Sequence, residues 1–220
     1  HRAAPLAEAV KHALKIASTT TGADSSCNVR SEELMLAQSR HQFIVQSFGS
    51  HLDVRNQKTY MLTEACLGGD LASYLRAMRE RAIPMTERFG RSLVACVVSA
   101  LGYLHSQQIM YRDLKPENLV VDPRGALKLV DFGLAKSSRN GPSYTLCGTA
   151  EYLAPEMIML QGHGREVDWW ALGVLAYELF HERTPFVSVE VGGTDGKAAA
   201  ALAACVPPPR RADREPTARY

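Results

Sequence analysis

Cysteines are few in this sequence of 220 residues, and none of the five stands in a metal-binding or redox spacing. A disulfide framework needs a denser set, and a zinc site needs closely spaced pairs such as Cys-x-x-Cys. Five scattered thiols suit a reducing compartment instead, so we expect a cytoplasmic protein with free cysteines. They are Cys27, Cys66, Cys96, Cys147 and Cys205.

Long apolar runs and a strong charge imbalance are also missing. The most apolar stretch, 169–180, is interrupted by Glu178 and is shorter than the roughly 20 residues that a membrane span requires. The formal net charge is only +2, and the arginines of 210–214 are interleaved with acidic residues, as in a solvated tail. We therefore expect neither a membrane span nor a nucleic-acid partner. The chain begins with His1 instead of Met and has no signal-peptide pattern, so we expect a fragment.

Hydrophobic periodicity predicts short strands followed by longer helices. Two apolar stretches flank Asp-Pro-Arg-Gly at 122–125, in which proline second and glycine fourth suit a type I turn, so we expect a hairpin. Residues 168–180 are apolar almost all round, which predicts a buried helix. Strands are expected at 11–17, 59–63, 119–121 and 127–130, and helices at 31–39, 87–107 and 168–180.

The composition changes after residue 186. Residues 191–197 are glycine-rich, 198–204 are mostly alanine, and 206–214 are rich in proline and arginine. No core-forming period continues through this stretch. We expect 187–220 to be a loosely ordered, low-complexity tail.

Three motifs carry polar residues that suit the transfer of a phosphoryl group. Residues 111–118 are Tyr-Arg-Asp-Leu-Lys-Pro-Glu-Asn, 131–133 are Asp-Phe-Gly, and 147–156 are Cys-Gly-Thr-Ala-Glu-Tyr-Leu-Ala-Pro-Glu. This reaction needs a carboxylate to orient the hydroxyl, cations to neutralise phosphate, and oxygen ligands for magnesium. Asp-Phe-Gly alone is more often a turn than a metal site, but the order and spacing of all three motifs are specific.

In these motifs the sequence resembles the protein kinases, and among them the serine/threonine kinases that depend on cyclic nucleotides. The resemblance covers about residues 10–186 and implies an α+β, two-lobed kinase fold for a domain of residues 1–186. Within it, 1–66 would be a partial N-lobe with the hinge, and 67–186 a partial, mainly helical C-lobe. It also implies ATP and Mg²⁺ as cofactors, and protein substrates with basic residues before the target serine or threonine.

The resemblance assigns the catalytic and metal-binding positions. Asp113 would accept the proton of the substrate hydroxyl, and Lys115 would reach the transferred phosphate. Asn118 and Asp131 would supply oxygen ligands to magnesium, brought together by the hairpin between them. Asp168 is expected to brace the backbone of the catalytic loop instead of contacting the substrate.

On the N-terminal side, Ala13-Leu14-Lys15 resembles the strand that places a lysine on the ATP phosphates. The carboxylate that pairs with Lys15 should lie on the following helix. Aligning His-Gln-Phe-Ile-Val at 41–45 with the family's pattern favours Glu32, with Glu33 as its rival.

Residues 60–70 resemble the hinge that links the two lobes. The backbone of Glu64 and Cys66 would hydrogen-bond the adenine edge, and Thr63 would guard the back of the pocket. Asp70, which is also a candidate helix cap, would approach the ribose. The remaining ATP-binding positions that the resemblance implies are Ala13, Glu117 and Val120.

Thr145 matches the activation-loop phosphorylation site of this group. A phosphate there adds about −1.5 to −2 charge, and Arg112 and Lys136 would hold it. The alternative is an unmodified surface threonine.

Acidic residues predict substrates rich in arginine. Asp70, Glu117 and Glu178 match positions that receive substrate arginines, and carboxylate–guanidinium pairs can be bidentate and therefore selective. Glu178 could equally be a helix residue with only a structural partner. Leu146 and Leu153 would line an apolar pocket for the residue after the target.

Two segments, Glu-Ala-Cys-Leu-Gly-Gly at 64–69 and Gln-Gly-His at 161–163, are similar to the cyclic-GMP-dependent branch. Cyclic-nucleotide-binding domains would have to lie outside this chain. The glycine-rich phosphate loop is not visible, and the late C-lobe helices have no counterpart after 186. We therefore expect residues 1–220 alone to be poorly active. A truncated or pseudokinase-like binding module is the alternative, although the whole catalytic set is present.

Overall fold

The computed structural model describes residues 12–18, 25–122 and 125–186. A three-stranded antiparallel sheet opens the fold, in the order β1 (His12–Ser18), β3 (Lys58–Glu64), β2 (Ser47–Asp53). Ala13 lies opposite Thr63 and Lys15 opposite Met61, so these side chains share one face of the sheet. Two of the predicted nucleotide-binding positions, Ala13 and Thr63, are thus neighbours across strands.

Strand β2 was not expected from the sequence. Its register against β3 shifts between Ser47 and Gly49, and its side chains are mostly exposed. A strand without a regular apolar face leaves no period-two signal. Helix α1 (Ser25–Gln38) also begins before residue 31, where it was predicted.

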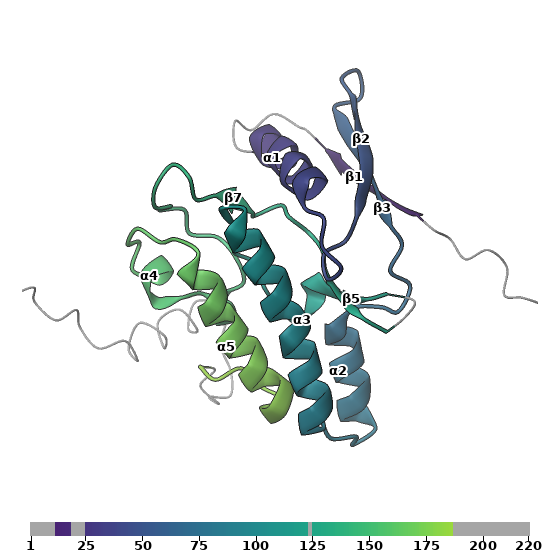
Figure 1. The fold of residues 1–220 in the computed structure, drawn as a ribbon, viewed down its shortest axis with the longest axis vertical. Helices are drawn as coiled ribbons and strands as arrows, with labels where there is room; N and C mark the ends of the chain where they lie inside the picture. The colour runs from purple at the N-terminus through teal and green to yellow at the C-terminus, as the bar shows by residue number, and fades with distance from the viewer. Residues whose placement is uncertain (1–11, 19–24, 123–124, 187–220) are drawn as a thin grey trace, which may run out of the picture.

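Three longer helices form the second part of the fold: α2 (Leu71–Glu80), α3 (Glu87–Ser106) and α5 (Glu166–His181). Asp70 is the N-cap of α2, as predicted, and its carboxylate accepts the N–H of Ser73 at 2.7 Å. Figure 1 shows the sheet and α1 at one end of the molecule and these helices at the other. The expected α+β, two-part fold is confirmed.

The main hydrophobic core lies where α3 packs against α5 and against strand β6 (Leu127–Leu129). Leu101 and Leu104 of α3 are completely buried there, with Leu175 of α5. The prediction of a buried helix at 168–180 holds for one face only, since Trp169 and Phe180 are 42% and 43% exposed.

Two short antiparallel strand pairs position the polar residues. Strand β4 (Ile109–Met110) pairs with β7 (Lys136–Ser137), and β5 (Leu119–Val121) pairs with β6 (Leu127–Leu129), as predicted for the hairpin. The turn between β5 and β6 is closed by the N–H of Gly125, which donates to the carbonyl of Asp122 at 2.9 Å. The short helices η1 (Pro116–Asn118), η2 (Ala150–Tyr152) and α4 (Pro155–Ile158) complete the described fold.

The segment between β3 and α2 is tied to the hairpin. The N–H of Gly68 donates to the carbonyl of Val121 at 3.0 Å, and the N–H of Val121 donates to Gly69 at 2.9 Å. Asp70 and Val120 form a further backbone bridge. The predicted hinge is thus attached to the strand that carries Val120. Among the described residues, no helix is both long and apolar enough to cross a bilayer.

Candidate active site

The open end of the β5–β6 hairpin brings Asn118 next to Asp131. Leu119 lies opposite Leu129, and one step further the N–H of Val130 donates to the carbonyl of Asn118 at 3.0 Å. Asp131 follows with φ of 56°, a left-handed conformation that is uncommon outside glycine. The hairpin therefore places two residues thirteen apart in sequence at one place, as predicted.

Asp113, Lys115 and Asn118 form one hydrogen-bonded group. The ammonium of Lys115 lies 3.0 Å from Oδ2 of Asp113, and Nδ2 of Asn118 donates to the same carboxylate at 2.8 Å. Nδ2 of Asn118 also donates to the backbone carbonyl of Asp113 at 2.8 Å. These bonds fix the Asp113 carboxylate while its Oδ1 faces Thr149.

Thr149 was not singled out in the sequence, although it lies inside the motif at 147–156. Its hydroxyl lies 2.9 Å from the Lys115 ammonium and 3.3 Å from Oδ1 of Asp113. Nothing in the sequence distinguishes this threonine from a surface residue of the loop. Only the fold brings its hydroxyl into contact with both the carboxylate and the ammonium.

Lys15 forms ion pairs with two carboxylates from distant segments. Its Nζ lies 2.6 Å from Oε1 of Glu32 and 3.0 Å from Oδ1 of Asp131. Glu33, the rival partner, instead accepts a hydrogen bond from the hydroxyl of Ser50. Of the two alternatives left by the sequence, the structure pairs Lys15 with Glu32.

The charges of this group shift their own pKa values. Burial would lower the pKa of Lys15, but the hydrogen bonds and charges of Glu32 and Asp131 outweigh it, so the pKa is raised. Burial would raise the pKa of Asp131, but Lys15 outweighs it and the pKa is lowered. The Lys15 contribution to stability is lost only as pH rises through the raised lysine value. The Asp131 contribution is lost only as pH falls through the lowered aspartate value. Lys15 and Asp131 are therefore both charged across neutral pH.

Asp168 braces the catalytic loop, as expected. It is completely buried, and its carboxylate accepts the N–H of Tyr111 at 2.9 Å and that of Arg112 at 2.7 Å. Nε2 of His105, which the sequence gave no reason to select, lies 2.7 Å from the same carboxylate. These bonds hold Arg112 at φ of 67° and so direct the chain into Asp113.

Tyr111 anchors the same loop to the residues that follow β6. Its ring is completely buried against Phe132 at a centroid distance of 5.5 Å, and its hydroxyl donates to the carbonyl of Val130 at 2.5 Å. Burial raises the pKa of Tyr111 well above its ordinary value, so the hydroxyl stays a donor. The loop that carries Asp113 is thereby joined to the strand that leads to Asp131.

The hinge residues are held by contacts of their own. The N–H of Glu64 donates to the carbonyl of Gln46 at 2.9 Å. Its carboxylate pairs with the buried ammonium of Lys128 at 2.8 Å, a contact that the sequence did not indicate. Burial, aided by the charge of Glu64, raises the pKa of the half-buried Cys66 thiol to about 11.

Arg112 and Lys136 converge on a hydroxyl, but it is not that of Thr145. Nη1 of Arg112 donates to Oγ of Ser143 at 3.0 Å, and Nζ of Lys136 donates to it at 3.2 Å. Ser143 is buried, whereas Thr145 is exposed and makes no hydrogen bond or ion pair with another described residue. The two predicted cations therefore lie together, two residues from the predicted phosphosite.

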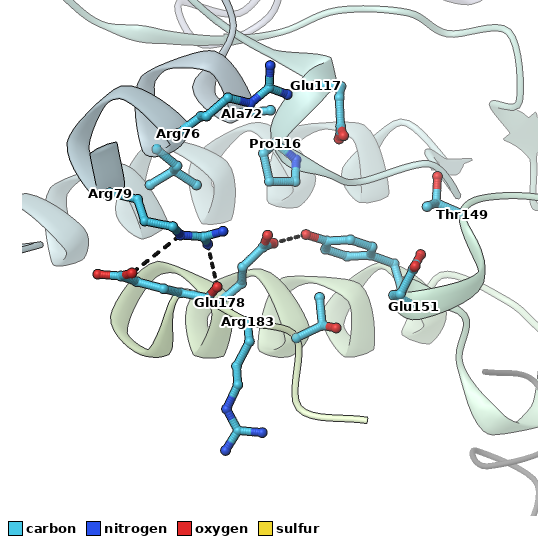
Figure 2. Close-up of a pocket in the computed structure, with 13 residues that line it drawn as sticks. Ala72, Arg76, Arg79, Pro116, Glu117, Thr149, Glu151, Glu178 and Arg183 are labelled. Atoms are coloured by element: carbon cyan, nitrogen blue, oxygen red, sulfur yellow. Dashed lines mark hydrogen bonds and ion pairs between the residues drawn. The ribbon is translucent and has the colours of Figure 1, made fainter. Parts of the chain in front are cut away.

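A cavity of about 420 Å³ contains two of the three acidic residues predicted to bind substrate. Glu117 and Glu178 line it, and Figure 2 shows both on its walls. The hydroxyl of Tyr152 donates to the carboxylate of Glu178, so Glu178 has a structural partner and also faces the cavity. Asp70 does not line it.

The two leucines predicted to line one apolar pocket lie in different surroundings. Leu153 is buried in a small cluster with Ala154, Met157 and Val167. Leu146 is 53% exposed. The two leucines therefore differ in burial, with Leu146 the more open to a ligand.

The oxygen donors at the hairpin end would suit a magnesium ion that takes few ligands from the protein. Within the described residues, no group of three or more His, Cys, Asp or Glu side chains could hold a metal ion. Magnesium commonly takes one or two protein oxygens and completes its shell with phosphates and water. Asp131, with its side chain 48% exposed, and the Asn118 amide oxygen would be such a pair.

Comparison with known proteins agrees with this geometry. The family model described as "Protein kinase domain" matches residues 3–206, which is most of the chain and continues past residue 186. The chain is 48% identical over 164 residues to human cGMP-dependent protein kinase 2, covering 74% of this chain and 21% of the human protein. It is 46% identical over 159 residues to a cAMP-dependent protein kinase catalytic subunit-like protein of Caenorhabditis briggsae, covering 72% and 40% of the two chains.

A third relative, cAMP-dependent protein kinase catalytic subunit 3 of Drosophila melanogaster, is 46% identical over 159 residues. This match covers 72% of the chain and 26% of the fly protein. The chain therefore spans less than half the length of the curated relatives that it matches.

Proposed function

Because the chain belongs to the protein kinase family, we propose that it transfers the γ-phosphate of ATP to a serine or threonine hydroxyl of a protein substrate. The carrying observation is the hydrogen-bonded group of Asp113, Lys115 and Asn118 beside the Lys15–Asp131–Glu32 ion pairs. A module that only binds a partner has no need of both groups. The fold aligns them from four separate segments.

Asp113 is the proposed acceptor of the substrate proton. The Thr149 hydroxyl contacts both Asp113 and Lys115, which supports a role for this ion pair in holding an oxygen that bears a proton. A substrate hydroxyl in a similar position would be oriented by the carboxylate, and the Lys115 ammonium would offset charge on the transferred phosphoryl group. Most of the catalysis would then come from positioning and electrostatics.

Asn118 and Asp131 would hold Mg²⁺, which when bound would neutralise the phosphates of ATP. Lys15, fixed by Glu32, would contact the phosphates directly. The carbonyl of Glu64 and the backbone of Cys66 would bind adenine, with Ala13, Thr63 and Val120 packed around it. Asp70 and Glu117 would lie near the ribose.

We further propose that substrates carry arginine before the target residue, and that the protein is cytoplasmic and of the cyclic-GMP-dependent type. The hinge sequence at 64–69 supports this branch, while the relatives include both cGMP- and cAMP-dependent kinases at similar identity. The acidic residues Glu117 and Glu178 in one cavity support the choice of arginine.

Two measurements on residues 1–220 separate a kinase from a binding module. Thermal unfolding with and without Mg-ATP tests nucleotide binding, and transfer of labelled phosphate to an arginine-containing serine peptide tests turnover. We expect stabilisation by Mg-ATP with little turnover. Clear turnover would contradict the expectation that this chain alone is poorly active, and absence of both signals would contradict the proposed function.

Thr145→Ala is expected to lower peptide phosphorylation in the full-length protein by roughly tenfold or more. The reason is that a phosphate at Thr145 would add charge-assisted hydrogen bonds to Arg112 and Lys136, which order the loop. Tyr144→Phe, which removes the hydroxyl of the exposed neighbour, is the matched control and should leave activity unchanged. Initial rates together with intact mass before and after phosphatase treatment provide the measurement. Equal rates for the Thr145 variant and the wild type would remove the proposed site.

A further inference from the structure

Lys128 is a buried cation whose partner comes from a distant part of the chain. It belongs to β6, and only 5% of the residue is exposed. Its ammonium lies 2.8 Å from Oε1 of Glu64, the last residue of β3. Burying a lysine costs free energy unless its charge is paired, so this ion pair is a specific feature of the fold. None of the proposed catalytic steps uses it.

The carboxylate of Glu64 is held from a second side by Gln46. Its Oε1 accepts the N–H of Gln46 at 2.8 Å, while the N–H of Glu64 donates to the carbonyl of Gln46 at 2.9 Å. Segment 43–46 is itself attached to β6, because Leu129 exchanges two backbone hydrogen bonds with residues 43 and 45. Both contacts of the Glu64 carboxylate therefore lead to β6, one through Gln46 and one through Lys128.

Lys128 also lies beside the proposed floor of the nucleotide site. Val120 of β5 is directly opposite it in the antiparallel hairpin, so the two side chains stand on the same face. Val120 is one of the residues proposed to pack around adenine, and the backbone of Glu64 is proposed to bind the edge of the base. Lys128 thus joins the hairpin that would support the base to the hinge residue that would recognise it.

Recognition of a base by its edge depends on how the hinge is placed over this floor. Hydrogen bonds weaken steeply when their geometry is distorted, whereas apolar packing is not directional. Adenine carries an amino donor where guanine carries a carbonyl acceptor, so a well-placed hinge rejects guanine by leaving polar groups unpaired. A hinge that can tilt should lose this discrimination and retain the apolar part of the binding.

From these contacts we infer that Lys128 is a positioning residue that sets the preference for adenine over guanine nucleotides. It acts through Glu64, which it holds in place relative to the β5–β6 hairpin. The inference rests on the proposed function, because it takes the hinge as the place where the base of ATP binds. It adds the side chain that makes this site selective for that base.

A cavity of about 350 Å³ beside the ion pair provides matched variants. Lys128 and Glu64 both line it, together with Arg40. An arginine at position 128 would have room to extend into this space and still pair with Glu64. Arg40 is exposed, and its side chain makes no hydrogen bond or ion pair with another described residue, so it supplies a control cation in the same cavity.

The test measures the dissociation constants of Mg-ATP and Mg-GTP for residues 1–220 by isothermal titration calorimetry. Wild type should prefer Mg-ATP. Lys128→Met removes the charge but keeps most of the length of the side chain, and it should weaken Mg-ATP about five- to tenfold and Mg-GTP by less than about twofold. Lys128→Arg should restore most of the preference, and Arg40→Met should leave both constants at their wild-type values.

A second variant separates positioning from a general loss of folding. Glu64→Gln keeps an oxygen for the N–H of Gln46 but removes the charge that pairs with Lys128, so it should weaken Mg-ATP as Lys128→Met does. Because both changes act through one ion pair, combining them should cost little more than either alone. A general loss of folding would instead weaken both nucleotides in proportion.

Equal losses for Mg-ATP and Mg-GTP in Lys128→Met, or additive losses in the double variant, would overturn the inference. A wild-type chain that binds neither nucleotide would refute the proposed function and remove this inference with it. A chain that binds Mg-ATP but keeps its full preference in Lys128→Met would refute the inference alone.

Discussion

Asp131→Asn in the full-length protein is expected to lower the rate of peptide phosphorylation by about 10²- to 10³-fold. The carboxylate is both the proposed magnesium ligand and one of two partners of Lys15 at 3.0 Å. An amide of the same size keeps the shape but removes the charge that holds both cations. The binding of Mg-ATP should therefore weaken together with the rate.

The effect of Asp131→Asn is measured by initial rates over a series of Mg-ATP concentrations and by thermal unfolding with Mg-ATP. Asp53→Asn neutralises the aspartate that ends β2, far from the site in sequence, and should leave both signals unchanged. Asp113→Asn should lower the rate but retain stabilisation by Mg-ATP, because Asp113 is proposed to contact the hydroxyl. A rate for Asp131→Asn within tenfold of wild type would contradict the metal assignment.

Asp168→Ala is expected to lower the free energy of unfolding by about 3–5 kcal/mol. The carboxylate is completely buried and receives three hydrogen bonds, from the N–H groups of Tyr111 and Arg112 and from His105. Alanine would leave those donors buried without an acceptor and would open a cavity. For a domain with total stability of about 5–15 kcal/mol, this loss is a large fraction.

Urea unfolding followed by circular dichroism measures the loss at Asp168. Glu166→Ala removes an exposed carboxylate from the first turn of the same helix and should cost well under 1 kcal/mol. If Asp168→Ala unfolds at the same urea concentration as wild type, the carboxylate does not brace the loop. A loss equal to that of Glu166→Ala would lead to the same conclusion.

Local patterns identified the main elements because those elements are stabilised by local signals. Asp70 was predicted as a helix cap, and the capping bond is present. The hairpin at 119–129 was predicted from its turn residues, and its register follows from them. Strand β2 was missed because its exposed, shifted register leaves no apolar alternation.

In the candidate site, too, some features follow from the local sequence and others only from the packing of distant segments. By itself, the sequence determined which residue types are present and in what order, since Tyr111–Asn118 and Asp131–Gly133 are contiguous motifs whose meaning depends on near neighbours. The choice of Glu32 over Glu33 for Lys15 needed the packing of α1 against the sheet, which decides which carboxylate faces inwards.

Only the tertiary structure could reveal the contacts between residues distant in the chain. His105 and Asp168 are separated by 63 positions, and Arg79 and Glu182 by 103, so no local period links them. Burial and the geometry of single side chains decide such pairs. Arg112 and Lys136 donate to the hydroxyl of Ser143 and not to that of Thr145. Arg79 lines the same cavity as Glu178. The motifs thus determined the chemistry that the site can perform, whereas the folded chain decided which charges surround it.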